Sequence, residues 1–81
     1  MKVSVYSLKK VHFEGVAISV NLKTTTGEIT ILDHHHPLIS ELASGTMKIV
    51  DVNKEEHFVP VSSGFLEIDA ENHAKIIIDE A

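Results

Sequence analysis

The chain has 81 residues, enough for one small domain, and its 12 acidic and seven basic side chains give a net charge of −5. A surface that binds nucleic acid needs clustered lysine or arginine, so this balance argues against nucleic acid as a partner. The sequence has no cysteine, which excludes disulfides and zinc–thiolate sites. It also has no apolar run near the roughly 20 residues that cross a bilayer.

Apolar and polar residues alternate along several short segments, the pattern of strands that turn one row of side chains toward a core. In chain order these segments are 3–5, 17–22, 29–31, 47–49 and 59–61. The unbroken run at 76–78 predicts a strand covered on both faces, or a terminal strand whose outer face meets a partner. Turn-forming residues recur about every 8–12 positions, as in sandwiches and barrels.

These patterns predict an all-β fold, a small two-layer and mostly antiparallel β-sandwich of about eight to ten short strands. No segment predicts a helix, and 38–42 is too short for more than a turn. Pro60 cannot donate to a ladder, so it predicts an edge or a bulge in its strand. We expect eight aliphatic side chains in the interior: Ile18, Val20, Leu22, Ile29, Ile31, Ile49, Leu66 and Ile68.

Three consecutive histidines follow an aspartate, and together they form a set of competent metal ligands: Asp33, His34, His35 and His36. Neighbouring residues on a strand point to opposite faces, however, so these side chains converge on one ion only if they lie on a loop. An exposed histidine-rich loop is the preferred interpretation. A small β domain that binds a divalent metal through this cluster stays open as the alternative function.

No motif of a catalytic site occurs in the sequence. A P-loop, a G-x-S-x-G elbow and an H-E-x-x-H pair are all missing, and the carboxylates are scattered. We therefore expect neither enzyme activity nor a cofactor.

A fixed order of motifs runs through the middle of the chain. Gly-Glu with alternating isoleucines at 27–31 is followed by a His-x-Pro-Leu loop at 35–38, a glycine-led strand at 45–50 and a serine- and glycine-containing stretch at 62–67. This order resembles the N-terminal β-sandwich domain of the epsilon subunit of rotary ATP synthase. The matching positions are Phe13, Gly15, Gly27, Glu28, Ile29, Ile31, His35, Pro37, Leu38, Gly45, Ile49, Val50, Ser62, Gly64, Leu66 and Glu67.

The resemblance implies a single domain over residues 1–81 in a non-catalytic central-stalk subunit. Such a subunit links the gamma subunit to the c-ring, helps couple ion flow to ATP synthesis, and meets the membrane only through the complex. It would lie at the cytoplasmic face of the bacterial inner membrane. The family continues into two C-terminal helices that inhibit ATP hydrolysis and in some members bind ATP, and this helical hairpin is expected to be absent.

The resemblance also implies which residues bind the partners. Glu28 alone would be interpreted as a solvated strand end, but in the family this glutamate faces the c-ring, and the loop with His35, Pro37 and Leu38 lies where gamma and the c-ring meet. We expect all four at one docking end of the sandwich, with Glu28 and Leu38 at its rim, where truncation changes stability by under about 0.5 kcal/mol. The family has Pro-Gly where this chain has Asp33-His34, which predicts the loss of a tight turn.

Overall fold

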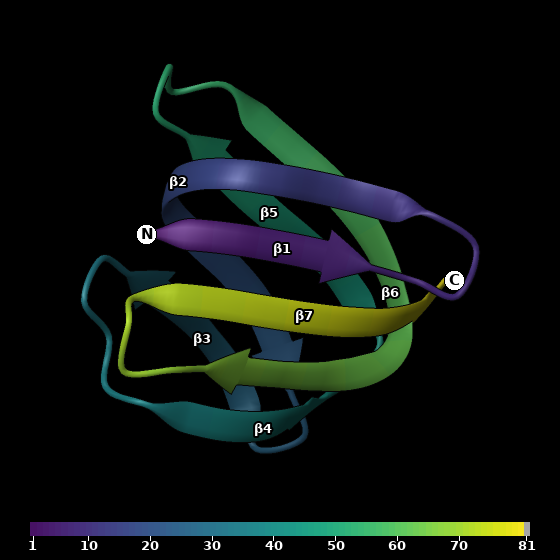
Figure 1. Ribbon diagram of the computed structural model, residues 1–81. Coiled ribbons are helices and arrows are strands. Elements are labelled where there is room, and N and C mark those ends of the chain that lie inside the picture. The colour runs from purple at the N-terminus through teal and green to yellow at the C-terminus, as the bar shows by residue number, and fades with distance from the viewer. Residues whose placement is uncertain (81) are drawn as a thin grey trace.

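The computed structural model describes residues 1–80, with the backbone alone at Glu80, and these residues form seven strands and no helix. The last residue of the predicted domain, Ala81, lies outside the described residues. In chain order the strands are β1 (Lys2–Tyr6), β2 (Val11–Thr24), β3 (Gly27–Leu32), β4 (Leu38–Leu42), β5 (Gly45–Asp51), β6 (Glu56–Ile68) and β7 (His73–Glu80) (Figure 1).

The predicted all-β class is confirmed, with fewer strands than the eight to ten expected. Two strands are long, because β2 has 14 residues and β6 has 13. Each of them serves both layers: β2 pairs with β1 along its first half and with β3 along its second. Likewise, β6 pairs with β5 along its first half and with β4 along its second.

The two long strands join the layers into a flattened barrel. One layer contains β3, the second half of β2, β5 and the first half of β6. The other contains β4, the second half of β6, β7, β1 and the first half of β2. In Figure 1, β1 and β7 lie in front of β5 and β3. The β1–β7 pair is parallel, and the pairs between the other neighbours are antiparallel.

The core is an aliphatic layer between the two sheets, and it contains six of the eight predicted residues: Val20, Leu22, Ile31, Ile49, Leu66 and Ile68. Ile29 is partly buried and packs against this layer. The prediction for Ile18 is wrong, because its side chain is 45% exposed. The register of β2 against β5 shifts between Ala17 and Ser19, so that Ala17 takes the inward place and Ile18 turns outward.

Two local features follow from proline. Residues 38–42, which were expected to be no more than a turn, form β4, and Pro37 before them favours an extended entry. Pro60 lies where β6 pairs with β5 but has not yet reached β7, whose pairing begins at Val61. The expected edge position of Pro60 is therefore confirmed, and a bulge follows directly between Val61 and Ser63.

Candidate partner-binding surface

The loop between β3 and β4 is held by residues that are distant in sequence. Asp33 forms an ion pair with the ammonium group of Met1 (2.7 Å) and accepts a hydrogen bond from Asn72 Nδ2 (2.7 Å). The amide of His34 in turn donates to Asn72 Oδ1 (2.7 Å). Asn72 belongs to the β6–β7 turn, so one side chain fastens this loop to the neighbouring turn. The Met1 ammonium group, and next the Asn72 amide, lower the pKa of Asp33 from 3.8 to about 2.

The predicted loss of the tight turn at Asp33-His34 is wrong. Residues 33 and 34 still form a turn, because His34 adopts the left-handed conformation with φ of 60°. Glycine takes this conformation without a steric cost, and the family has glycine at this position. The chain thus forms a turn here although an exposed imidazole stands at a position that favours glycine.

The histidine cluster does not form a metal site. Within residues 1–80, no group of three or more histidine, cysteine, aspartate or glutamate side chains could hold a metal ion. Asp33 is occupied by the Met1 ammonium group and Asn72, and His34 Nε2 is 3.6 Å from its second oxygen. The Nδ1 of His35 lies 2.7 Å from the carbonyl oxygen of His36. The alternative function as a metal-binding domain is therefore not supported.

Glu28 and the histidine loop lie at opposite ends of β3. Glu28 pairs with Lys23 beside the β2–β3 hairpin, whereas Leu32 precedes the loop at the other end of the strand. Four residues of strand separate these ends, which is about 13 Å. The expectation of one docking end that contains all four residues is therefore wrong. A surface that includes both must extend along β3.

The four predicted contact residues differ in exposure. Glu28, His35 and Pro37 are exposed, and Glu28 accepts a hydrogen bond from Asn21 Nδ2 (3.1 Å). Leu38 is half-buried and packs against the core, so it is not a simple rim residue. Any role of Leu38 in binding is combined with a role in stability.

A second exposed surface was not predicted residue by residue. We call it the outer apolar patch. It consists of three exposed side chains on the outside of the β4–β6–β7 layer, Ile39, Phe65 and Ile77, together with the fully exposed Leu8 at the tip of the β1–β2 turn. Phe65 and Ile77 are direct cross-strand neighbours. The isoleucine run at 76–78 was the signal for it, since Ile76 and Ile78 are buried while Ile77 is 61% exposed. That a partner covers this outer face remains a prediction.

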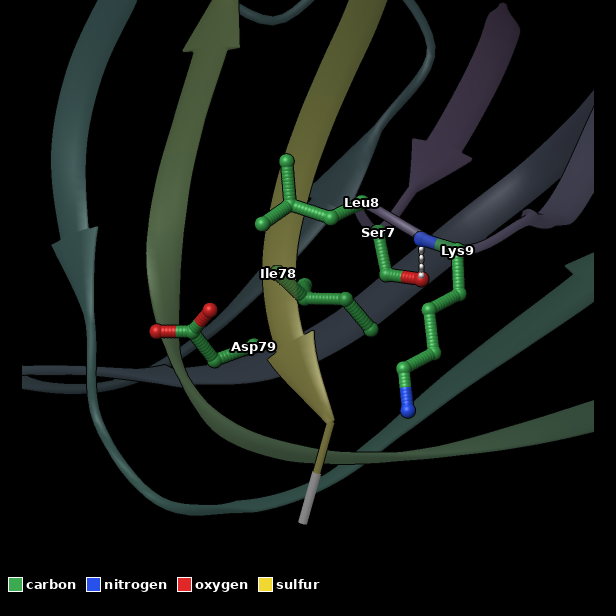
Figure 2. A pocket seen from close by; sticks show the side chains of 5 residues that line it. All are labelled: Ser7, Leu8, Lys9, Ile78 and Asp79. Carbon is green, nitrogen blue, oxygen red and sulfur yellow. Dashed lines mark hydrogen bonds between the residues drawn. The ribbon is translucent and has the colours of Figure 1, made fainter.

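A shallow hollow of about 360 Å³ opens beside this patch, where the β1–β2 turn crosses the end of β7 (Figure 2). The Leu8 and Ile78 side chains form its apolar wall, and the Lys9 amide donates to Ser7 Oγ (3.3 Å). Lys9 and Asp79 extend on opposite sides of β7 in Figure 2. The hollow therefore lacks the converging polar groups of a substrate pocket.

A serine and a histidine do meet elsewhere, on the β1, β2 and β7 strands. Ser4 Oγ lies 2.9 Å from His73 Nε2 and 3.4 Å from Glu14 Oε2, and the Tyr6 hydroxyl donates to the same Glu14 oxygen. The hydrogen bond from Tyr6 is the main cause that lowers the pKa of Glu14. Ser4 is only 1% exposed, so no substrate can reach its hydroxyl. The cluster ties three strands together.

The fold and these surfaces define a small β-sandwich that offers exposed strands and a fastened loop to other proteins. The whole chain, residues 1–81, matches the family model described as the β-sandwich domain of the ATP synthase delta/epsilon chain. The chain therefore belongs to this family, which confirms the resemblance found in the sequence.

Individual relatives agree with the family assignment. The ATP synthase epsilon chain of Shouchella clausii is 40% identical over 81 residues, all of this chain and 59% of that protein. The sodium ion specific ATP synthase epsilon chain of Propionigenium modestum is 43% identical over 74 residues, 91% of this chain and 52% of that protein. The chain thus spans little more than half the length of these relatives.

Two solved structures share the fold. A chain of the Euglena gracilis mitochondrial ATP synthase superposes with a TM-score of 0.87 at 16% identity, over 94% of this chain and 48% of that one. A chain from the central stalk and c-ring of the Tetrahymena thermophila mitochondrial ATP synthase gives 0.80 at 20% identity, over 99% and 63%. At such identities the likeness concerns the fold alone.

Proposed function

We propose that this chain is part of a non-catalytic subunit in the central stalk of a rotary ATP synthase, where it links the gamma subunit to the c-ring. The observation that carries the proposal is the family match over all 81 residues, with epsilon chains 40% and 43% identical to it. Through this link the subunit helps couple ion translocation to ATP synthesis. It performs no chemistry and needs no cofactor.

The proposed place of the chain follows from the complex to which the family belongs. Among the described residues, no helix has the length and apolar character needed to cross a bilayer. We propose a peripheral position at the cytoplasmic face of the bacterial inner membrane, held by gamma and the c-ring. The domain proposed for this role is the sandwich of residues 1–81, over which the family model matches.

The partner contacts proposed are Glu28 at the hairpin end of β3 and His35, Pro37 and Leu38 at the loop end. This assignment rests on the matching family motif and on the exposure of the first three side chains. Because the two ends are separated along β3, the proposed surface is elongated, and each end can contact a different subunit.

The test is binding of the chain to a purified gamma subunit and c-ring from a bacterial ATP synthase that has a closely similar epsilon chain. We expect a stable complex, and a Glu28→Ala, His35→Ala double variant with about 30-fold weaker binding or worse, since truncating central contacts costs about 1–2 kcal/mol each. A Val52→Ala variant in the β5–β6 turn, where the side chain is 57% exposed, is the matched control and should bind normally. A wild-type chain that fails to bind either subunit would refute the proposed function.

A further inference from the structure

β3 has a partner strand along only one of its edges. It pairs with β2 from Gly27 to Leu32 with no bulge, and within residues 1–80 no strand lies along its other edge. Alternate residues of a strand direct their N–H and C=O groups to opposite edges, so about half of these groups on β3 point away from β2. An edge of this kind is a template for another strand.

Two other open stretches of the sheet are interrupted, and β3 is not. β4 also lacks a second partner over most of its length, but it is only five residues long and its last residue, Leu42, pairs with Thr24 of β2, so β3 offers the longer free edge. The first part of β6 has an open edge on the side of β7, and Pro60 lies within it and cannot donate. The first half of β2 is open on the side of β5, and the bulge between Ala17 and Ser19 follows it. β3 contains neither proline, nor lysine or arginine, nor a bulge. Natural proteins use these devices against unwanted pairing, so their absence from β3 indicates a strand that is meant to be paired.

The side chains of β3 indicate the chemistry of the missing strand. On the inner face Ile31 is fully buried, but Ile29 is only half-buried, so apolar surface at the edge is left for another aliphatic side chain to cover. On the outer face Glu28 and Thr30 are exposed, and Glu28 brings a carboxylate to the edge strand. The whole chain carries a net charge of −5, which adds to the preference for a basic segment.

We propose that the free edge of β3 binds an extended segment of a partner polypeptide by strand addition, with an aliphatic side chain beside Ile29 and a basic side chain beside Glu28. Main-chain hydrogen bonds hold such a segment, and its alternate side chains give the selectivity. This inference rests on the proposed function, because it gives the mode by which the Glu28 end of the surface holds its partner.

A second copy of this chain is the less suitable occupant. In a two-fold pair of β3 strands no basic residue would face Glu28, since the segment from Gly27 to Leu32 contains none. Each copy would also bring its own charge of −5 to the interface. A basic, alternating segment of another protein satisfies both the backbone groups and the carboxylate.

The test uses an acetylated octapeptide of alternating valine and lysine as the probe, and amide hydrogen exchange of the chain as the readout. We expect the probe to slow exchange at alternate residues of β3 by about tenfold or more at saturation, because each new hydrogen bond must open before its amide can exchange. The same peptide methylated on alternate backbone nitrogens should bind about tenfold more weakly or worse, since it cannot complete the ladder. A valine–glutamate octapeptide should also bind more weakly, because its carboxylates face Glu28.

Two matched variants place the binding on the edge. Ile29→Lys puts a charge on the inner face of the edge strand, where an added strand would bury it, and should weaken probe binding about tenfold or more. Val52→Lys puts the same charge in the β5–β6 turn, where the side chain is 57% exposed, and should bind like the wild type. Circular dichroism of both variants verifies that they are folded.

Four results would overturn the inference. In the first, the β3 amides are equally protected with and without probe at low protein concentration. In the second, the β3 amides become protected only as the protein concentration rises, which would make a second copy of the chain the occupant. The probe could also bind without any change on β3. Finally, if Ile29→Lys still assembles with gamma and the c-ring at full affinity, the edge inference fails while the proposed function stands. If the wild-type chain fails to assemble but β3 is still protected by the probe, only the proposed function fails.

Discussion

His34 holds its loop in a conformation that costs free energy. Its φ is 60°, its side chain is 80% exposed with Nε2 3.6 Å from an oxygen of the neighbouring Asp33, and its amide donates to Asn72. Left-handed geometry costs a residue with a Cβ about 1 kcal/mol or more, and glycine avoids this cost. The shape of the loop therefore depends on the backbone and on Asn72, not on the imidazole.

We expect His34→Gly to raise the free energy of unfolding by about 0.5–1 kcal/mol, because the relief of strain exceeds the added entropy of the unfolded chain. Urea denaturation measures this change. His36→Gly is the matched control: His36 is exposed and its φ is not positive, so glycine should lower stability there by about 0.5–1 kcal/mol. Equal losses at both positions would contradict the strain at His34.

Single residues of this loop show what the sequence could not reveal. The sequence predicted an exposed histidine loop and a break with the family's Pro-Gly, and both features are present. It could not predict that the turn survives, because the side chain that fastens it, Asn72, lies 38 residues further along the chain from His34. No local pattern announces such a contact.

At the scale of strands, the close approach of β6 and β7 depends on Gly64. A Cβ at this position would lie 2.3 Å from the carbonyl oxygen of Ile77 and 3.0 Å from the Cα of Ile78, and both are backbone atoms that cannot rotate away. Gly15 on β2 differs, because the nearest atom to its Cβ would be a ring carbon of Phe13 at 3.8 Å.

We therefore expect Gly64→Ala to destabilise the domain by about 2–4 kcal/mol, as overpacking against a rigid backbone does. Gly15→Ala should change the unfolding free energy by less than about 1 kcal/mol. Thermal unfolding of both variants under one buffer condition measures the contrast. Similar midpoints for the two variants would show that β7 moves aside at little cost.

The β5–β6 hairpin is stabilised by a carboxylate that titrates. Asp51 accepts hydrogen bonds from His57 Nε2 (2.8 Å) and from the amides of Asn53 (2.8 Å) and Glu55 (3.0 Å). These partners, His57 first, lower the pKa of Asp51 below its ordinary 3.8. A lowered pKa in the folded state means that the stabilisation is present above about pH 4 and is lost as pH falls through the folded value.

Asp51→Asn should therefore unfold at lower urea concentration than the wild type at about pH 7, and the difference should shrink at about pH 3. His57→Gln removes the first cause of the shift and should produce part of the same loss at neutral pH. Urea midpoints at the two pH values measure both effects. A difference that is constant with pH would mean that Asp51 acts through shape alone.

Alternation predicted most of the buried rows, and it failed where a strand departs from regular geometry. Val20, Leu22 and Ile31 are buried as expected, while Ile18 is displaced outward by the bulge in β2. The strand count was too high for a related reason, since a long strand that bends through both layers resembles two short strands in the sequence. Bulges and bends depend on the neighbouring strands, so they are set by tertiary pairing and not by the local pattern.

For the whole molecule, we expect the 81 residues alone not to bind ATP tighter than about millimolar. A polyanion is repelled by the net charge of −5, and the lining of the hollow beside Leu8 contains Asp79 as well as Lys9. Calorimetric titration of the purified chain with ATP is the measurement, and heat that fits a micromolar site would contradict this prediction.

A change at Glu28 should affect partner binding but not stability, whereas a change at Leu38 should affect both. Glu28 is exposed and hydrogen-bonded to Asn21, so Glu28→Ala should lower affinity for gamma and the c-ring about tenfold while changing stability by under about 0.5 kcal/mol. Leu38 is half-buried against the core, and truncation of a fully buried leucine costs about 2–5 kcal/mol, so Leu38→Ala should cost about 1–2 kcal/mol of stability. Leu38→Met keeps the apolar volume and should restore the stability, so that any affinity still missing is a contact effect. Unfolding midpoints and binding measured on the same three variants decide the matter: if Glu28→Ala and Leu38→Ala, both measured while folded, bind like the wild type, neither residue is a contact and the partners dock elsewhere on the sandwich.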